Sequence, residues 1–123
     1  MATIGPLWGN WTTDLNASGL GSASGYAQST DLDLSAGSAD LAEVQVDVTA
    51  GTSTDIDVFV YGGNPTGTMD TTPRYAYNVA ADDVRSFALH GMSQARIKVV
   101  DNAATNDGSV TVKHRMRQWT DTV

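Results

Sequence analysis

Two Asp-x-Asp pairs, Asp31 with Asp33 and Asp55 with Asp57, are the first candidates for chemistry in this sequence. Residues two apart on an extended strand share a face and lie about 7 Å apart, a separation that suits glycoside hydrolysis or a shared cation. Outward aspartates on half-buried strands also keep a sheet soluble and discourage pairing between sheets. We favour this second interpretation, so the pairs predict no catalytic site.

The two histidines belong to no catalytic motif. Nucleophilic catalysis needs a Ser, Thr or Cys beside a base that a third group orients, and the sequence shows no such arrangement. His90 precedes a turn, and His114 lies between Lys113 and Arg115. We expect a structural or electrostatic role for His114, with no catalytic residue, no cofactor and no metal ligand.

Side chains that could bind Ca²⁺ gather in residues 101–108, as Asp101, Asn102, Asn106 and Asp107. They lack the order of an EF-hand loop, and the segment ends in Asp-Gly, which is typical of a tight turn. We therefore predict a turn, and Ca²⁺ binding by an aspartate cluster stays open.

Arg74, Tyr75 and Tyr77 could stack against a sugar or a base. Alternating aromatic residues are equally what the face of a β-sandwich contains, and we favour packing. These three residues are the expected ligand site if the protein is instead a carbohydrate-binding or receptor-binding module.

A basic and aromatic stripe is predicted near the C-terminus, because Lys113, Arg115, Arg117 and Trp119 fall on one face of an extended strand. Arg and Trp are common anchors in protein interfaces, and the stripe could pair with acidic strands of the same or a neighbouring subunit. The alternative is a solvated edge strand protected by its charge.

The first 27 residues differ from the remainder, because glycines interrupt every possible period. Trp8 and Trp11 would be costly to leave in water, so we expect an extended arm that packs on its own domain or on a neighbour. The chain is therefore divided into an N-terminal arm, 1–27, and a domain, 28–123.

Alternation of aliphatic and polar residues begins near residue 29 and predicts short strands. We expect a hairpin in which residues 50–54 form the turn between strands near 43–48 and 55–60. A long surface loop follows Tyr61. Seven to eight strands at intervals near a dozen residues predict an all-β fold, an antiparallel β-sandwich of jelly-roll or immunoglobulin-like topology. The expected inward residues are Leu32, Leu34, Val44, Val46, Val48, Ile56, Val58, Val60, Phe87, Leu89, Ala95, Ile97, Val99, Val110 and Val112.

Composition excludes several function classes. The chain has 123 residues, a net charge of -7 and no cysteine, which rules out disulfides and thiolate metal sites. Residues 1–73 hold nine acidic and no Lys or Arg residues, and the rest hold seven basic and five acidic ones. This excess of acid argues against nucleic-acid binding and suits oriented docking on a protein. We see no secretion signal and no apolar span that would cross a membrane.

The order of segments resembles the small β-sandwich virion proteins of tailed bacteriophages, above all head decoration or cement proteins. The likeness covers about residues 28–118 and lies in short phrases such as Asp-Ile-Asp-Val-Phe-Val and Ala-Arg-Ile-Lys-Val-Val-Asp-Asn. It implies a non-enzymatic homo-oligomer that is assembled in the bacterial cytoplasm and docks on the major capsid protein or other virion subunits at the capsid exterior. A neck or tail structural protein is the third possibility.

Overall fold

A computed structural model describes residues 3–23, 25–34, 41–49, 51, 55–63, 68–103 and 105–122. In these residues the chain forms ten β-strands. They are β1 (Thr3–Trp8), β2 (Thr12–Leu20), β3 (Ala27–Gln28), β4 (Leu32–Asp33), β5 (Leu41–Thr49), β6 (Asp55–Gly63), β7 (Tyr75–Ala80), β8 (Val84–His90), β9 (Gln94–Val100) and β10 (Gly108–Thr122). The described part of the chain contains no helix with the length and apolar character to span a membrane.

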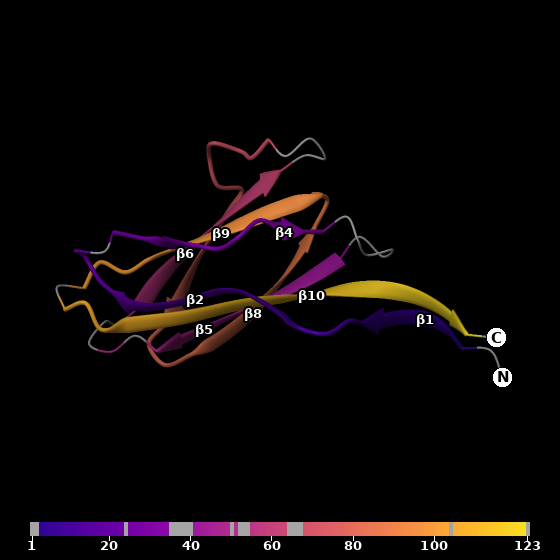
Figure 1. The fold of residues 1–123 in the computed structure, drawn as a ribbon, viewed down its shortest axis with the longest axis horizontal. Helices are drawn as coiled ribbons and strands as arrows, with labels where there is room; N and C mark the ends of the chain where they lie inside the picture. The colour runs from indigo at the N-terminus through magenta and orange to yellow at the C-terminus, as the bar shows by residue number, and fades with distance from the viewer. Residues whose placement is uncertain are drawn as a thin grey trace.

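The strands form two antiparallel sheets that face each other (Figure 1). Sheet A runs β1-β10-β5-β8, with β2 on the same edge of β10 as β1, and sheet B runs β3-β9-β6-β7, with β4 beside β3 along β9. This confirms the predicted all-β antiparallel sandwich. The described residues hold ten strands instead of seven to eight because both the N-terminal segment and short pieces around residue 30 join the sheets.

The path of the chain between the sheets decides the topology that the sequence left open. β2 lies in sheet A, β3 and β4 in B, β5 in A, β6 and β7 in B, β8 in A, β9 in B and β10 in A. The order β2-β10-β5-β8 facing β3/β4-β9-β6-β7 is that of a jelly roll.

The core lies between the sheets and is built by alternate residues of each strand. In β5 the valines at 44, 46 and 48 are buried, and in β6 Ile56, Val58 and Val60 are buried. Burying each such side chain stabilises the fold by about 1.5–3 kcal/mol relative to leaving it in water. Of the expected inward residues, Phe87 is half-buried and all others are buried.

The predicted hairpin around residues 50–54 is wrong. β5 pairs with β10 and β8, whereas β6 pairs with β7 and β9, so this connection crosses from sheet A to sheet B. Strand alternation is the same whether the next strand lies beside its predecessor or opposite it, so the two cases look alike in sequence. Among the described strands, β6 and β7 are the consecutive pair that lies side by side in one sheet, and the long loop that the sequence predicts falls between them.

The N-terminal segment is extended but is not an arm outside the sandwich. β2 pairs with Gly108–His114 of β10, and β1 pairs with Arg117–Thr122 farther along the same edge. β5 stops opposite Arg117, so β10 continues beyond it with β1 as its partner among the described strands. The pair projects from the sandwich, with Thr3 and Thr122 paired at its far end (Figure 1). We call residues 3–8 and 117–122 the ribbon.

Candidate assembly surface

Arg115 lies where the ribbon leaves the sandwich. Its guanidinium carbon is 4.7 Å from the centre of the Trp8 ring and 4.5 Å from that of Trp11. Its Nη2 also donates a hydrogen bond of 3.0 Å to Oε1 of Glu43 on β5. Cation–π contacts of this kind contribute about 0.5–2 kcal/mol each. One side chain therefore joins β1, the link to β2, and two central strands of sheet A.

The sequence of β10 explains why these groups meet on the outer face. Val110, Val112 and His114 are buried between the sheets, so the alternate positions Lys113 and Arg115 point away from the core. Lys113 and Arg115 of the predicted stripe thus share one face, and Arg115 pairs with Glu43 on a strand of the same chain. Nε of Arg117 is buried and has no hydrogen-bond partner among the described residues. The side chain of Trp119 lies outside the described residues.

Trp8 and Trp11 remain 39% and 37% exposed despite the guanidinium between them. The amide of Gly9 donates a 2.8 Å hydrogen bond to the carbonyl of Met116, which holds the link between the two tryptophans against β10. This segment therefore packs only in part on its own domain, since Trp8 and Trp11 each keep more than a third of their surface exposed. Their role in an interface stays a prediction.

His114 makes a buried side-chain contact with Asp14. Nδ1 of His114 lies 2.7 Å from Oδ2 of Asp14, and their side chains are 11% and 4% exposed. Leu15 pairs with Val112 and Thr13 with Lys113, so Asp14 is the extra residue of a β-bulge. A bulge re-aims one side chain, and here it turns the carboxylate toward the imidazole. The pair joins β2 to β10, in agreement with a structural role, and nothing in the sequence indicated its partner.

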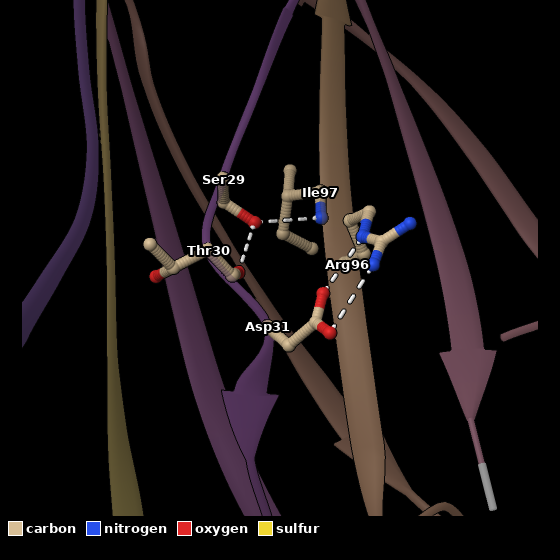
Figure 2. A network of polar contacts seen from close by, with 5 residues as sticks. All are labelled: Ser29, Thr30, Asp31, Arg96 and Ile97. Carbon is tan, nitrogen blue, oxygen red and sulfur yellow. Dashed lines mark hydrogen bonds and ion pairs between the residues drawn. The ribbon is translucent and has the colours of Figure 1, made fainter. Parts of the chain in front are cut away.

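Asp31 does not act with Asp33 as a pair of carboxylates. It holds Arg96 of β9 through two hydrogen bonds, of 2.7 and 3.1 Å, and this contact raises the pKa of Arg96 (Figure 2). Beside it, the hydroxyl of Ser29 accepts from the amide of Ile97 and donates to the carbonyl of Thr30. These bonds hold the residues between β3 and β4 against β9.

The second pair is also engaged in the sheet, because Oδ1 of Asp57 accepts a 3.0 Å hydrogen bond from Asn78 on β7. Among the described residues, no three His, Cys, Asp or Glu side chains gather in a way that could hold a metal ion. Asp31 and Asp57 thus each form a contact between neighbouring strands.

The segment 101–108 is a packed turn. Oδ1 of the buried Asp101 accepts from the amide of Ala103, and a Cβ at Gly108 would come within 2.5 Å of Oδ2 of Asp101. Oδ1 of Asn106 accepts from the amide of Ala23. The Asp-Gly sequence marks the crossing from β9 in sheet B to β10 in sheet A, and not a hairpin within a sheet.

Tyr77 is packed and does not offer an open ring for a ligand. It stacks on Phe87 at 4.4 Å between ring centres, and the guanidinium of Arg85 lies 5.5 Å from its centre. Tyr75 is 40% exposed at the end of β7. Arg74 is bound to Asp70 at 2.6 Å, which lowers the pKa of Asp70 and raises that of Arg74. The rings of Tyr75 and Tyr77 lie 6.4 Å apart between their centres, so the structure brings these two residues together. Ligand binding by Arg74, Tyr75 and Tyr77 stays a prediction.

No family model and no curated protein matches this sequence. A solved structure shares the fold: a chain from the structure described as "Bacillus endospore appendages form a novel family of disulfide-linked pili". The match covers 96% of this chain and 89% of that chain with a TM-score of 0.54 and 14% sequence identity. At this identity the likeness shows the fold.

This match overturns the resemblance to phage virion proteins. The chain aligns over nearly its whole length with a protein of endospore appendages, and the expectations of a head, neck or tail protein, a capsid partner and a place on the capsid exterior are wrong. The short sequences on which the resemblance was based, such as Asp-Ile-Asp-Val-Phe-Val, are strands with alternating aliphatic and polar residues. Such patterns are common to β-sandwiches in general and do not distinguish one family from another.

Proposed function

We propose that this protein is a non-enzymatic structural subunit that polymerises with copies of itself into a pilus-like filament on the outside of a cell or spore. The observation that carries the proposal is the shared fold over 96% of the chain with a protein of pili. In this proposal the partner is a second copy of the chain, and neither nucleic acid nor a lipid membrane takes part.

The arrangement of sheet A supports this function. β1 and β2 lie at one edge of the sheet and β8 at the other, so both edges are open in the described chain. An open edge carries unpaired amides and carbonyls that can pair with a strand of another chain. When one edge of a subunit meets the opposite edge of the next, the contact repeats head to tail and produces an open filament.

The absence of cysteine separates this chain from the disulfide-linked pili of the matched description. A filament of this protein would depend on strand pairing, side-chain contacts and the number of weak contacts along its length. We therefore expect its assembly to be reversible on dilution and insensitive to reducing agents.

The polar clusters also support a structural role. His114 and Asp14 join β2 to β10, Asp31 and Arg96 fasten β9, and Arg115 and Glu43 join β10 to β5. Each pair connects strands that are far apart in sequence. Such pairs hold a jelly roll in shape.

Assembly is tested by sedimentation velocity and negative-stain electron microscopy of the purified chain over a range of concentrations, with and without reductant. We expect filaments above a critical concentration that is the same in both conditions. A protein that stays monomeric at every concentration would overturn the proposal.

A lysine on an edge strand tests which edge takes part, because a charged side chain there discourages pairing. Ser86→Lys changes an exposed position on β8 of sheet A, and Ala76→Lys is its match on β7, at the edge of sheet B. We expect Ser86→Lys to raise the critical concentration at least ~10-fold, the equivalent of about 1.4 kcal/mol, and Ala76→Lys to leave it unchanged.

A further inference from the structure

The ribbon is a two-stranded extension of sheet A. β1 pairs with β10 alone among the described strands, whereas β10 within the sandwich has β2 on one side and β5 on the other. A two-stranded ribbon without further support is at best marginally stable in water. Side chains at its base therefore have a large share in deciding whether β1 stays along β10.

Arg115 is the residue placed to do this. It lies beside the Gly9–Trp11 link, with one indole from β1 on its guanidinium and a second from the residue just before β2. Glu43 holds the same guanidinium from the far side of β10, on β5. The guanidinium is planar and can stack on rings while its edge donates hydrogen bonds, which an ammonium cannot do in the same way.

We propose that Arg115 is a positioning residue for assembly: held between Trp8 and Trp11 and bound to Glu43, it fixes the ribbon in the direction in which a second copy of the chain binds it. The inference rests on the proposed function and names the residue on which subunit contact depends. Releasing the guanidinium frees β1 and leaves the sandwich folded, because the core residues of β10, Val110 and Val112, lie on the opposite face of the strand.

The sandwich offers a matched control. Arg85 lies 5.5 Å from the centre of the Tyr77 ring and donates a 3.0 Å hydrogen bond to the carbonyl of Asn78. It therefore has a ring contact and a hydrogen bond, as Arg115 has, but it lies on β8, the strand at the other edge of sheet A. Arg85→Met removes a cation–π contact without touching the ribbon.

The test compares Arg115→Met, Arg115→Lys and Arg85→Met by hydrogen exchange of the unassembled protein, and it compares the two Arg115 variants with the wild type by critical concentration as well. In Arg115→Met we expect the amides of Thr3–Trp8 to exchange ~10-fold faster or more, since two ring contacts and an ion pair are lost. Amides of β6 and β9 should keep their protection. Arg115→Lys should lie between the wild type and Arg115→Met, and Arg85→Met should leave the β1 amides as they are.

The critical concentration for assembly is measured for the same Arg115 variants. Arg115→Met should raise the critical concentration ~10-fold or more, and Arg115→Lys should restore part of the loss. Unchanged exchange of β1 in Arg115→Met, or faster exchange with unchanged assembly, would overturn the inference. A wild-type chain that never assembles overturns the proposed function instead, and exchange on that monomer still shows whether Arg115 holds the ribbon.

Discussion

The sandwich and the ribbon are made of the same kind of strand but are stabilised in different ways. In the sandwich, alternate side chains of both sheets fill one core, with Val58, Ile97 and Val112 fully buried. In the ribbon, β1 and the end of β10 have each other as strand partners, and the base is held by one arginine between two tryptophans. Apolar burial is non-directional and shared by many residues, whereas the base of the ribbon is held by directional contacts, those of the Arg115 guanidinium and the hydrogen bond from Gly9 to Met116.

This difference indicates where a substitution should affect the whole domain and where its effect should stay local. Loss of a contact in the sandwich lowers the stability of the whole domain, because the core is cooperative. Loss of a contact at the base of the ribbon should act locally, since local opening needs less free energy than global unfolding. Stability and assembly are therefore expected to separate in this protein.

Two N-terminal deletions give the largest expected effect. Removing residues 1–10 takes away β1 and should leave a folded monomer that no longer assembles. Removing residues 1–27 also takes away β2, including the buried Leu20 and Asp14, which exposes the edge of β10 and leaves His114 without its partner. We expect this longer deletion to unfold or aggregate. Circular dichroism and sedimentation distinguish the two proteins.

The same two deletions test the domain boundary that the sequence predicts at residue 28. A stable, soluble fragment 28–123 would support that boundary and contradict the importance of β2 for the sandwich. Equal behaviour of both deletions would remove the distinction between sandwich and ribbon altogether.

Loss of the contact between Asp14 of β2 and His114 of β10 should have an intermediate effect on stability. Asp14→Ala leaves a buried imidazole without its acceptor, and we expect a loss of about 1–3 kcal/mol in the free energy of unfolding, measured by urea denaturation. Asn16→Ala, at an exposed position of the same strand, is the control and should change stability little. If the two variants are equally stable, the pair contributes nothing to the sandwich.

The smallest effect is expected at the exposed contact between Arg74 and Asp70. Because Arg74 lowers the pKa of Asp70 from its ordinary value of 3.8, the charged carboxylate favours the folded state. Its contribution is present above pH 4 and is lost as the pH falls through the lowered pKa of the folded state. The melting temperatures of the wild type and Arg74→Gln should differ slightly at pH 7 and converge near pH 2. A difference that grows on acidification would contradict this.

Strand positions were readable from sequence wherever one face is buried. The alternation at Val44, Val46 and Val48 predicted β5, and the patterns at Tyr75–Val79 and Ala95–Val99 predicted β7 and β9. β1 and β2 were missed because glycines and exposed polar residues obscure their period, and they owe their place to hydrogen bonds along β10. The local alternation of residues does not show that a segment pairs with a strand that is distant in the sequence, as β1 and β2 do with β10.

The candidate assembly surface could be read from the sequence in part. The single face shared by Lys113, Arg115 and Arg117 follows from spacing alone, because side chains alternate along a strand. That Trp8 and Trp11 enclose Arg115 could not be read from residues more than 100 positions apart. The partner of His114 could not be read from the sequence either. A β-bulge turns Asp14 toward His114, and the two residues are 100 positions apart.

The sequence by itself determined that this chain builds alternating strands with aliphatic faces, lacks thiol chemistry and concentrates its basic residues after residue 73. Which sheet each strand joins, the change of sheet between β5 and β6, and the pairing of β1 with the end of β10 are visible only in the tertiary structure. The physical reason is that the period of a strand specifies which side faces the core, whereas pairing is specified by contacts between residues distant in the chain.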